Sequence, residues 1–214
     1  MRANANTIIV DEELILVPYR EEHVAKYHEW MLNPELRELT ASEPLSLEEE
    51  YEMQRKWQDD EDKLTFIICV REPNAKAVWA ANDGSTQTTA SLVMIGDVNL
   101  FFKGSPLDED FEVEAEVMIA DPAYRRRGYA SRALQLLLSY ATSPSSPAPL
   151  PIPPHVLVVR IGEGNGASLR VFERLGFVIT KRVEVFKELE MRFRGSTDVW
   201  KQGVVRPYDE LPCF

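Results

Sequence analysis

The chain has 214 residues, of which 44% are hydrophobic and 28% charged, and its net charge is −11. This length and composition predict one globular domain whose apolar residues form a core without the help of disulfides or a metal. The negative charge argues against general nucleic-acid binding, which depends on summed positive charge, and fits a cationic or amine-bearing partner better.

Two features bear on the compartment in which the protein acts. Cys69 lies in an apolar run and Cys213 is next to the last residue, and we expect free thiols in a reducing compartment, with a disulfide as the alternative. The sequence shows neither a signal-peptide core after Met1 nor the about 20 consecutive apolar residues of a membrane span. We therefore expect a cytoplasmic protein without membrane contact, with the nucleus as the alternative.

The first third of the chain alternates between strand and helix patterns. Residues 7–19 are rich in β-forming residues but interrupted by three acidic ones, which predicts a hairpin or one bulged strand. Apolar residues at helical spacing predict a helix over 21–32, stopped or kinked at Asn33-Pro34.

A second helix and a buried strand follow. Ser46 and Glu49 form a capping-box pattern, which is typical of a helix start. The apolar run 64–70 predicts a buried strand. Residues 71–90 are polar and aperiodic, and we expect a mobile loop there.

Two more strands precede an arginine-rich loop. Residues 91–102 predict a strand with a glycine at its middle, and residues 111–121 alternate in polarity. The alternation places Val113, Ala115, Val117 and Ile119 on one face of the strand and Glu112, Glu114, Glu116 and Met118 on the other. Beyond the loop, residues 130–141 predict an amphipathic to fully buried helix.

The last part of the chain predicts three strands and a helix. Residues 142–154 carry six of the fourteen prolines and are interpreted as an extended insertion before the next strand, with an interdomain linker as the alternative. That strand spans 155–161. Asn165 and Gly176 bound a short helix as its N-cap and its end. Two closing strands follow over 177–193.

The loop 121–130, DPAYRRRGYA, connects a strand to a helix. At such a junction the free N–H groups of the loop and of the first helical turn, together with the helix dipole, favour an anion such as a diphosphate. Gly128 permits close backbone approach and Ala130 leaves room over the helix start. A solvated basic turn and a nucleic-acid contact are the alternatives; the flanking strand and helix argue against the first and the net charge against the second.

Two segments resemble the GNAT acetyltransferase superfamily. Its acetyl-coenzyme A signature (Arg or Gln, two residues, Gly, one residue, Gly or Ala) is matched by Arg125, Gly128 and Ala130. The segment 165–177 is similar to the helix after the superfamily's fifth strand, with matches at Asn165, Ser168, Phe172, Gly176 and Phe177. The resemblance covers most of the chain and is closest to the eukaryotic N-acetyltransferase 9-like branch.

The resemblance implies an α/β GNAT fold. Its central sheet is mixed, mostly antiparallel and twisted, with about seven strands, helices on both faces and a splayed pair of strands, the fourth and fifth, that holds the cofactor. We expect a single acetyltransferase domain over 1–195, with insertions at 71–90 and 142–154, and a C-terminal tail over 196–214.

The resemblance also implies acetyl-coenzyme A (acetyl-CoA) as the co-substrate. No Cys or acidic partner of the histidines recurs at metal-ligand spacing, so no metal is expected. The implied cofactor-binding residues are Met118, Ile119, Arg125, Arg126, Arg127, Gly128, Tyr129, Ala130, Asn165, Ser168 and Phe172. Among them Met118 and Ile119 would offer backbone groups to the pantetheine arm, the loop would surround the diphosphate, and Phe172 would lie near the thiol.

Acyl transfer to an amine requires the amine to lose its proton, usually to a carboxylate or through ordered water. Glu114 and Glu116 are the candidate general bases, and Glu114 stands where some superfamily members place theirs; two solvated edge carboxylates are the alternative. Phe172 replaces a tyrosine that protonates the leaving thiolate in many members, and phenylalanine has no proton to give. The acid is then expected at Tyr140, Tyr129 or water; the alternatives are that there is no strong acid step or that the enzyme is impaired.

The predicted function is an acetyl-CoA-dependent N-acetyltransferase that moves an acetyl group to an amine of a protein or peptide by direct attack in a ternary complex. The alternative is a non-catalytic acyl-CoA-binding or interaction module of the same fold, associated with the cytoskeleton. If the helix over 21–32 forms the acceptor wall, His28 and Glu29 would line it. The sequence leaves the acceptor and the oligomeric state open.

Overall fold

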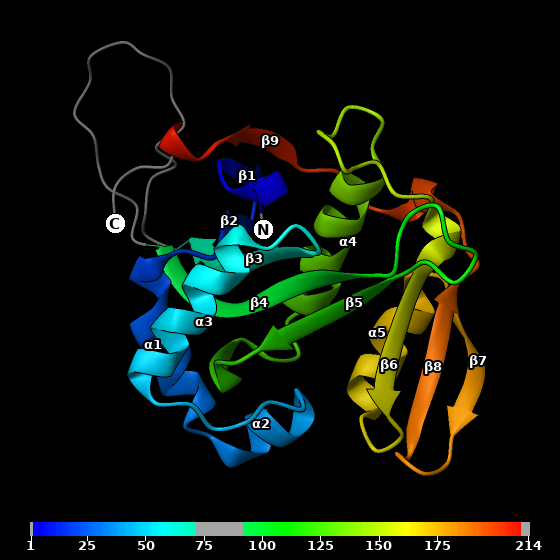
Figure 1. Ribbon diagram of the computed structural model, residues 1–214, viewed down its shortest axis with the longest axis horizontal. Helices are drawn as coiled ribbons and strands as arrows, with labels where there is room; N and C mark the ends of the chain where they lie inside the picture. Colours follow the sequence, from blue (N-terminus) through cyan, green and yellow to red (C-terminus); the bar gives the residue numbers. More distant parts are fainter. Residues whose placement is uncertain (1, 72–91, 211–214) are drawn as a thin grey trace.

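The computed structural model describes residues 2–71 and 92–210. Its strands within these ranges are β1 (Thr7–Val10), β2 (Leu14–Pro18), β3 (Lys63–Arg71), β4 (Leu92–Lys103), β5 (Glu112–Ile119), β6 (Leu157–Gly162), β7 (Phe177–Val183), β8 (Glu188–Phe193) and β9 (Val204–Pro207). They form one mixed sheet in the order β7-β8-β6-β5-β4-β3-β2-β1-β9 (Figure 1). Neighbouring strands are antiparallel except β5 and β6, which are parallel.

The described sheet has nine strands, more than the resemblance implied. Residues 7–19 form a β1–β2 hairpin, the first of the two predicted alternatives, in which Asp11 donates its N–H to the Leu14 carbonyl at 3.0 Å. The hairpin thus accounts for one additional strand, and the second additional strand is β9. Strand β9 pairs with β1, with Thr7 opposite Pro207 and Val10 opposite Val204 at the two ends. Most of β9 is exposed, so backbone pairing rather than an apolar pattern defines it, and periodicity could not predict it.

The helices are α1 (Glu21–Met31), α2 (Pro34–Leu39), α3 (Leu47–Asp59), α4 (Tyr129–Thr142) and α5 (Gly166–Arg174). Four of them confirm predicted helices, and the capping box is present, since Ser46 and Glu49 each accept a hydrogen bond from the other's backbone N–H. The addition is α2. Asn33 caps it through Oδ1, which accepts from the Glu35 N–H at 2.9 Å, and Pro34 occupies a first-turn position that suits proline.

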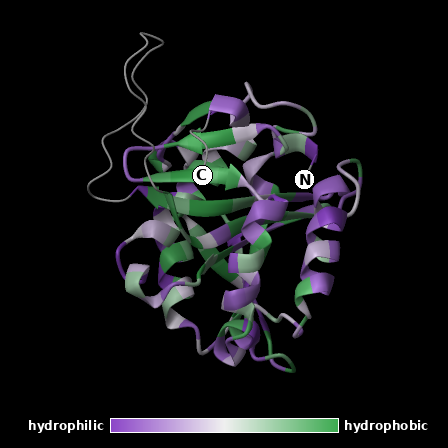
Figure 2. Cartoon of the chain, turned by 90° about the vertical axis from the view of Figure 1, so that its left-hand side faces the viewer, coloured by the Kyte–Doolittle hydropathy of each residue, from purple (hydrophilic) through white to green (hydrophobic). Residues whose placement is uncertain are grey.

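Two hydrophobic clusters lie on opposite faces of the sheet. One joins the sheet to α4 and α5, and the other joins it to α1, α2 and α3 (Figure 1). Figure 2 shows mostly hydrophobic strands, with hydrophilic residues concentrated on the helices and turns. In the described ranges no helix has the length and apolar character needed to cross a bilayer.

The two predicted insertions differ in what the structure describes. The loop predicted at 71–90 lies outside the described residues apart from Arg71, which ends β3. Residues 143–156 connect α4 to β6, and two apolar side chains of this segment, Leu150 and Ile152, are buried against the first cluster. The free thiol of Cys69 is buried on β3, and Cys213 lies outside the described residues.

The parallel strands β5 and β6 separate after two residue pairs. They pair only at Val113 with Leu157 and at Glu114 with Val158, although β5 continues to Ile119 and β6 to Gly162. Beyond Glu114 the β6-facing edge of β5 therefore has no strand partner. This is the splayed pair that the resemblance implied.

A bulge in β4 shapes the end of β5 at this gap. Ile68 of β3 pairs with Gly96 of β4, and the next residue of β3, Cys69, pairs with Met94. Ile95 of β4 is therefore an extra residue without a pairing partner on β3. The Ile95 carbonyl accepts the N–H of Ala120 at 2.8 Å. A Cβ atom on Gly96 would overlap the Met118 carbonyl oxygen, so only glycine allows β4 and β5 to approach this closely.

Candidate active site

The arginine-rich loop is anchored to the end of β5 by its first arginine. Arg125 donates from Nε to the Ile119 carbonyl at 2.9 Å and from a terminal nitrogen to the Ala120 carbonyl at 3.1 Å. Its guanidinium is therefore engaged with the strand. The exposed Arg126 and Arg127 remain as the loop's outward charges, and the Arg127 guanidinium lies 5.4 Å from the Tyr124 ring centre.

The loop and the start of α4 present a row of free backbone N–H groups. Within the described chain, the N–H groups of Arg126, Arg127 and Gly128 meet no hydrogen-bond acceptor. Gly128 is the N-cap of α4 and supplies no capping side chain, and the N–H groups of the first helical turn lack partners by geometry. Arg126 and Gly128 have φ of 62° and 86°, the conformation that turns successive N–H groups toward one anion.

The loop 121–130 is the candidate anion-binding loop, and the space above its Gly128 is open. A Cβ atom at this position would meet nothing within 4 Å, so glycine is required here by φ and not by crowding. Tyr129 and Ala130 follow as the first residues of α4. The residues predicted to surround a diphosphate are thus brought together, with Arg125 in an anchoring position.

Alternate residues of β5 present their backbone groups to the gap. The Ala120 N–H and the Met118 carbonyl both face β4, the former as a donor to Ile95 and the latter against Gly96. Since backbone groups alternate along a strand, those of Val117 and Ile119 face the open edge. The structure therefore favours Val117 over the predicted Met118 as the residue whose backbone group reaches the gap, while the Ile119 carbonyl is taken by Arg125.

Glu114 is a buried, ion-paired carboxylate. It is 6% exposed, and its Oε2 accepts hydrogen bonds from Lys103 Nζ and, at 2.8 Å, from the Arg160 guanidinium. Arg160 also binds Glu112 at 2.6 Å, and Glu112 binds Arg192 at 2.9 Å. This network joins β4, β5, β6 and β8 where β5 and β6 still pair, so the alternative of a solvated edge carboxylate is wrong for Glu114.

Glu116, two residues further along β5, has the opposite surroundings. Its side chain reaches solvent and makes no ion pair or hydrogen bond with another described residue. Desolvation by the surrounding protein, with repulsion from Glu114 and Asp97, raises the pKa of Glu116 to about 7. A carboxyl group that is accessible, unpaired and half-ionised near neutral pH is suited to accept a proton.

A buried polar group on β4 flanks Glu116. Asn99 pairs with Glu116 across the two strands, and Asp97 lies two pairs further along, opposite Met118. The Asp97 carboxylate accepts from Asn99 Nδ2 at 3.0 Å and from the Tyr27 hydroxyl of α1 at 3.3 Å. Burial raises the pKa of Asp97 to about 6.

The sequence interpretation missed Asp97, Asn99 and the ion-pair partners Lys103 and Arg160. A signal was present, because a charged residue in the middle of an apolar strand is costly unless it is paired. Asp97 and Arg160 both stand in such runs. Their partners depend on strand order, which periodicity does not reveal.

Helix α5, which follows β6, contains Ser168 and Phe172, two of the predicted cofactor residues, and the third, Asn165, is its N-cap. Asn165 caps the helix through Oδ1, which accepts from the Ser168 N–H at 3.1 Å, and its Nδ2 makes no hydrogen bond within the described chain. Phe172 is 2% exposed and packs edge-on against Phe177, with 5.2 Å between ring centres. Phe172 therefore has almost no surface to offer a cofactor.

The tyrosines considered as general acids lie away from Glu116. Tyr140 is 5% exposed on α4 and packs edge-on against Phe66 of β3. Tyr129 starts α4 and pairs with Tyr124 of the loop, with 6.1 Å between ring centres. Both therefore belong to other parts of the molecule, the core and the anion-binding loop respectively.

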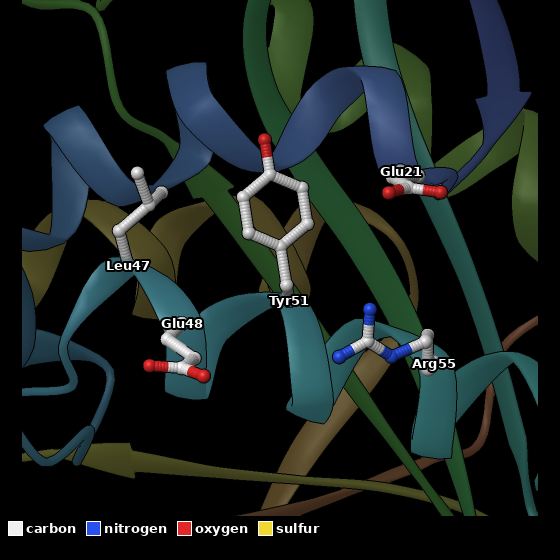
Figure 3. A pocket seen from close by; sticks show the side chains of 5 residues that line it. All are labelled: Glu21, Leu47, Glu48, Tyr51 and Arg55. Atoms are coloured by element: carbon white, nitrogen blue, oxygen red, sulfur yellow. The ribbon is translucent and has the colours of Figure 1, made fainter.

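The helical face opposite α4 has two hollows. The larger, about 530 Å³, lies between α1 and α3 and is lined by Glu21, Leu47, Glu48, Tyr51 and Arg55 (Figure 3). None of its lining residues comes from β5, β6 or α4, so it is separate from the gap. The smaller, about 150 Å³, is lined by residues of α1, of α3 and of the segment between α2 and α3.

Of the two residues expected on an acceptor wall, one faces inward. His28 Nδ1 lies 3.9 Å from Glu50 Oε1, and Glu50 lines the smaller hollow. Glu29 is exposed and pairs with Lys26 at 2.7 Å on the outer side of α1.

Comparisons with known proteins show which family the chain resembles. A family model described as "Acetyltransferase (GNAT) domain" matches residues 13–178. An "Alpha/beta-tubulin-N-acetyltransferase 9" of Drosophila melanogaster is 42% identical over 100% of both chains. The Homo sapiens protein of the same name is 41% identical over 92% of this chain and 87% of its own length.

A solved structure shares the fold at low sequence identity. The spermidine N-acetyltransferase from Vibrio cholerae, in complex with CoA and spermine, superposes with a TM-score of 0.60 at 17% identity. The match covers 94% of this chain and 99% of that one.

Proposed function

Because the chain belongs to the GNAT acetyltransferase family, we propose that it transfers the acetyl group of acetyl-CoA to an amine of a protein or peptide by direct attack in a ternary complex. The chain is thus an acetyltransferase, and the proposal concerns its acceptor and its catalytic residues. The observation that carries it is the gap between β5 and β6, with an anion-binding loop at one end and an accessible carboxylate beside it.

The residues around the gap fit acetyl-CoA. The free N–H groups of Arg126, Arg127 and Gly128 suit its diphosphate, and the unpaired backbone edge of β5 at Val117 suits its amide-bearing arm. Asn165 Nδ2 is an available donor on the opposite side. When bound, acetyl-CoA supplies a thioester, an acyl donor activated toward amines.

We assign the role of general base to Glu116. The acceptor amine must give up a proton before it attacks, and a carboxylate whose pKa is about 7 accepts a proton at neutral pH and releases it again. Glu114 is a poorer candidate because Lys103 and Arg160 occupy its carboxylate. Its role is to hold β5 and β6 together at the point from which they diverge.

The proton donor for the departing thiol is proposed to be water. Phe172 has no proton to give, Tyr140 is buried in the core, and Tyr129 belongs to the anion-binding loop. Water is the remaining donor among those considered, and the solvent exposure beside Glu116 admits it.

We propose a protein acceptor, with tubulin as the first candidate. Two relatives at 41–42% identity carry tubulin in their names. The test is to incubate the protein with acetyl-CoA and either α/β-tubulin or a peptide library, and to identify acetylated sites by mass spectrometry. Acetyl-CoA binding with no turnover on any acceptor would overturn the proposal and favour a non-catalytic module.

A further inference from the structure

The cavity of about 150 Å³ on the helical face has one buried charged group. Its walls are largely apolar and aromatic, from Tyr27, Met31, Met53 and Trp57. Glu50 of α3 also lines it. Among the described residues that line the cavity there is no lysine or arginine to neutralise this carboxylate.

Glu50 lacks a hydrogen-bond partner for one of its oxygens. The residue is 1% exposed, and Oε2 is buried without a partner in the described chain. The nearest basic group, His28 Nδ1, lies 3.9 Å from Oε1, beyond hydrogen-bonding distance. His28 is thus an ion-pair partner at the limit of range for Oε1, while Oε2 has none. Leaving one oxygen of a buried carboxylate unpaired is costly and calls for an explanation such as a bound cation.

The cavity shares its inner wall with the surroundings of Glu116. Tyr27, which lines the cavity, donates its hydroxyl to Asp97 at 3.3 Å, and Asp97 contributes to the raised pKa of Glu116. Trp57, also in the lining, packs edge-on against Phe101, with 6.1 Å between ring centres. Phe101 in turn pairs with Glu114 across β4 and β5. Two residues that line the cavity therefore contact β4 side chains that neighbour Glu114 and Glu116.

The mouth of the cavity is acidic and partly open. Ser42, Glu43 and Leu45, from the segment between α2 and α3, line it and are exposed or half-buried. A lysine or arginine side chain has the matching chemistry, because its aliphatic stem packs on apolar and aromatic surface while its charged end seeks a carboxylate.

We propose that this cavity binds the side chain of a lysine or arginine that neighbours the acetylated amine in the acceptor, with Glu50 pairing with its charged end. The inference rests on the proposed function and specifies the acceptor: a peptide segment with a basic residue close to the reacting amine. Tyr27 and Trp57 flank the stem, and Glu43 adds negative charge at the entrance.

The test uses peptides that differ only in the charge of one residue. Arginine is compared with citrulline, its uncharged analogue of nearly the same shape, at each of the positions that follow the acetylated amine. The wild type is expected to acetylate one arginine peptide with a kcat/KM at least about 10-fold above its citrulline partner, mainly through KM. Equal kcat/KM for all pairs overturns the inference, and this outcome requires no variant.

The matched variants are Glu50→Gln and Glu48→Gln, which remove the same charge from the same helix. Glu48 is exposed and lines the other hollow. Glu50→Gln is expected to abolish the preference for arginine and leave acetyl-CoA affinity unchanged, whereas Glu48→Gln keeps the preference. A preference that survives Glu50→Gln assigns the recognition to another site and overturns the inference.

Direct binding separates this inference from the proposed function. The affinity of the arginine and citrulline peptides for the protein with CoA is measured by calorimetry, which requires no turnover. Selective binding through Glu50 without acetylation would refute the enzyme while supporting the site. Spermidine, a free polyamine, is the third ligand in the binding experiment. If it binds through Glu50 more tightly than every peptide does, the assignment of the cavity to a peptide side chain is overturned.

Discussion

Glu114 and Glu116 lie two residues apart on one face of β5, yet their surroundings differ in every respect that matters for proton transfer. Glu114 is buried and paired with two cations, while Glu116 reaches solvent between other carboxylates. Alternation along a strand places both on the same face, but strand order decides which of them meets Arg160. The residue with the perturbed pKa is therefore the one that we propose as the general base.

Replacing Glu116 by Gln is expected to lower kcat/KM by about 100-fold or more, the range typical of a lost general base. In the wild type, kcat/KM should rise with pH and level off above about 7, since the pKa of Glu116 is raised to that value and only the ionised form accepts a proton. The variant should lose this inflection. The pH dependence of steady-state acetylation measures both effects.

Glu114→Gln is the comparison variant for this experiment. It removes the negative charge that Lys103 and Arg160 share, so it should lower thermal stability. The inflection should persist but move to lower pH, because repulsion from Glu114 contributes to the raised pKa of Glu116. An inflection lost in Glu114→Gln and retained in Glu116→Gln would reassign the base to Glu114.

Asp97 allows a prediction about stability. Folding raises its pKa from 3.8 to about 6, so the folded state holds the proton more tightly than the unfolded state does. The contribution of Asp97 to the free energy of unfolding therefore falls as pH rises from about 4 to about 6. Asp97→Asn should remove this contribution to the fall in the free energy of unfolding with pH. The asparagine oxygen still accepts hydrogen bonds from Tyr27 and Asn99.

Thermal unfolding at pH 5 and pH 7.5 tests this expectation. The Tm of Asp97→Asn relative to wild type should be higher at pH 7.5 than at pH 5. A residual decline with pH is expected in the variant because the pKa of Glu116 is also raised. Identical pH dependence in the two proteins would contradict the assignment to Asp97.

At the scale of elements, the loop before α4 depends on backbone conformation more than on charge. Arg125 is engaged with two carbonyl groups of the strand end, and Gly128 adopts a positive φ at the helix N-cap. The three arginines suggest a basic patch, but the free N–H groups are the feature that a diphosphate requires.

Gly128→Ala should destabilise the protein by about 1 kcal/mol, because alanine is strained at a φ of 86°. The new methyl group would also project into the open space above the loop, so weaker acetyl-CoA binding is expected. Gly164→Ala is the matched control, since Gly164 has neither a positive φ nor a neighbour within 4 Å. Calorimetric titration with acetyl-CoA and thermal unfolding of both variants provide the measurements.

Sequence patterns predicted the long elements of the fold and failed where long-range pairing decides the structure. The helices α1, α3, α4 and α5 follow from apolar periodicity and caps. The short α2 begins at Pro34, a residue predicted to stop or kink the preceding helix, and β9 has no apolar pattern.

The same division holds for the candidate site: its local features could be predicted from the sequence, and its long-range contacts could not. Its loop and its two candidate carboxylates have local signatures in the sequence. The ion pair between Glu114 and Arg160 joins residues on two strands that meet only in the folded sheet, as does the contact between Tyr27 and Asp97. No spacing along the chain encodes such contacts.

At the scale of the whole molecule, the outer edge of the sheet is remote from the gap. Four strands, β4, β3, β2 and β1, separate β5 from β9 in the sheet order. The segment after β9 returns to α1, where the Tyr208 ring lies 3.6 Å from the Arg20 guanidinium and its hydroxyl donates to Glu22 at 2.7 Å. This edge should therefore affect stability without affecting the site.

Truncation after Lys201 tests this separation. The shortened protein keeps the buried Trp200 but loses β9 and the Tyr208 contacts, so its Tm should fall by at least about 5 °C. Acetyl-CoA affinity, measured below the transition, should stay within about twofold of wild type. A large loss of affinity would show that the edge and the gap are coupled.

The pairing of β9 with β1 also constrains the order of folding during synthesis. Thr7 leaves the ribosome about 200 residues before its partner Pro207, so β1 can pair on one side only, with β2, while most of the chain is being made. Its other edge is an unpaired strand edge throughout that period, the kind of surface on which nascent chains associate. Completion of the sheet is therefore a late event, and chaperone capture of the nascent chain should persist until residue 207 is free to pair.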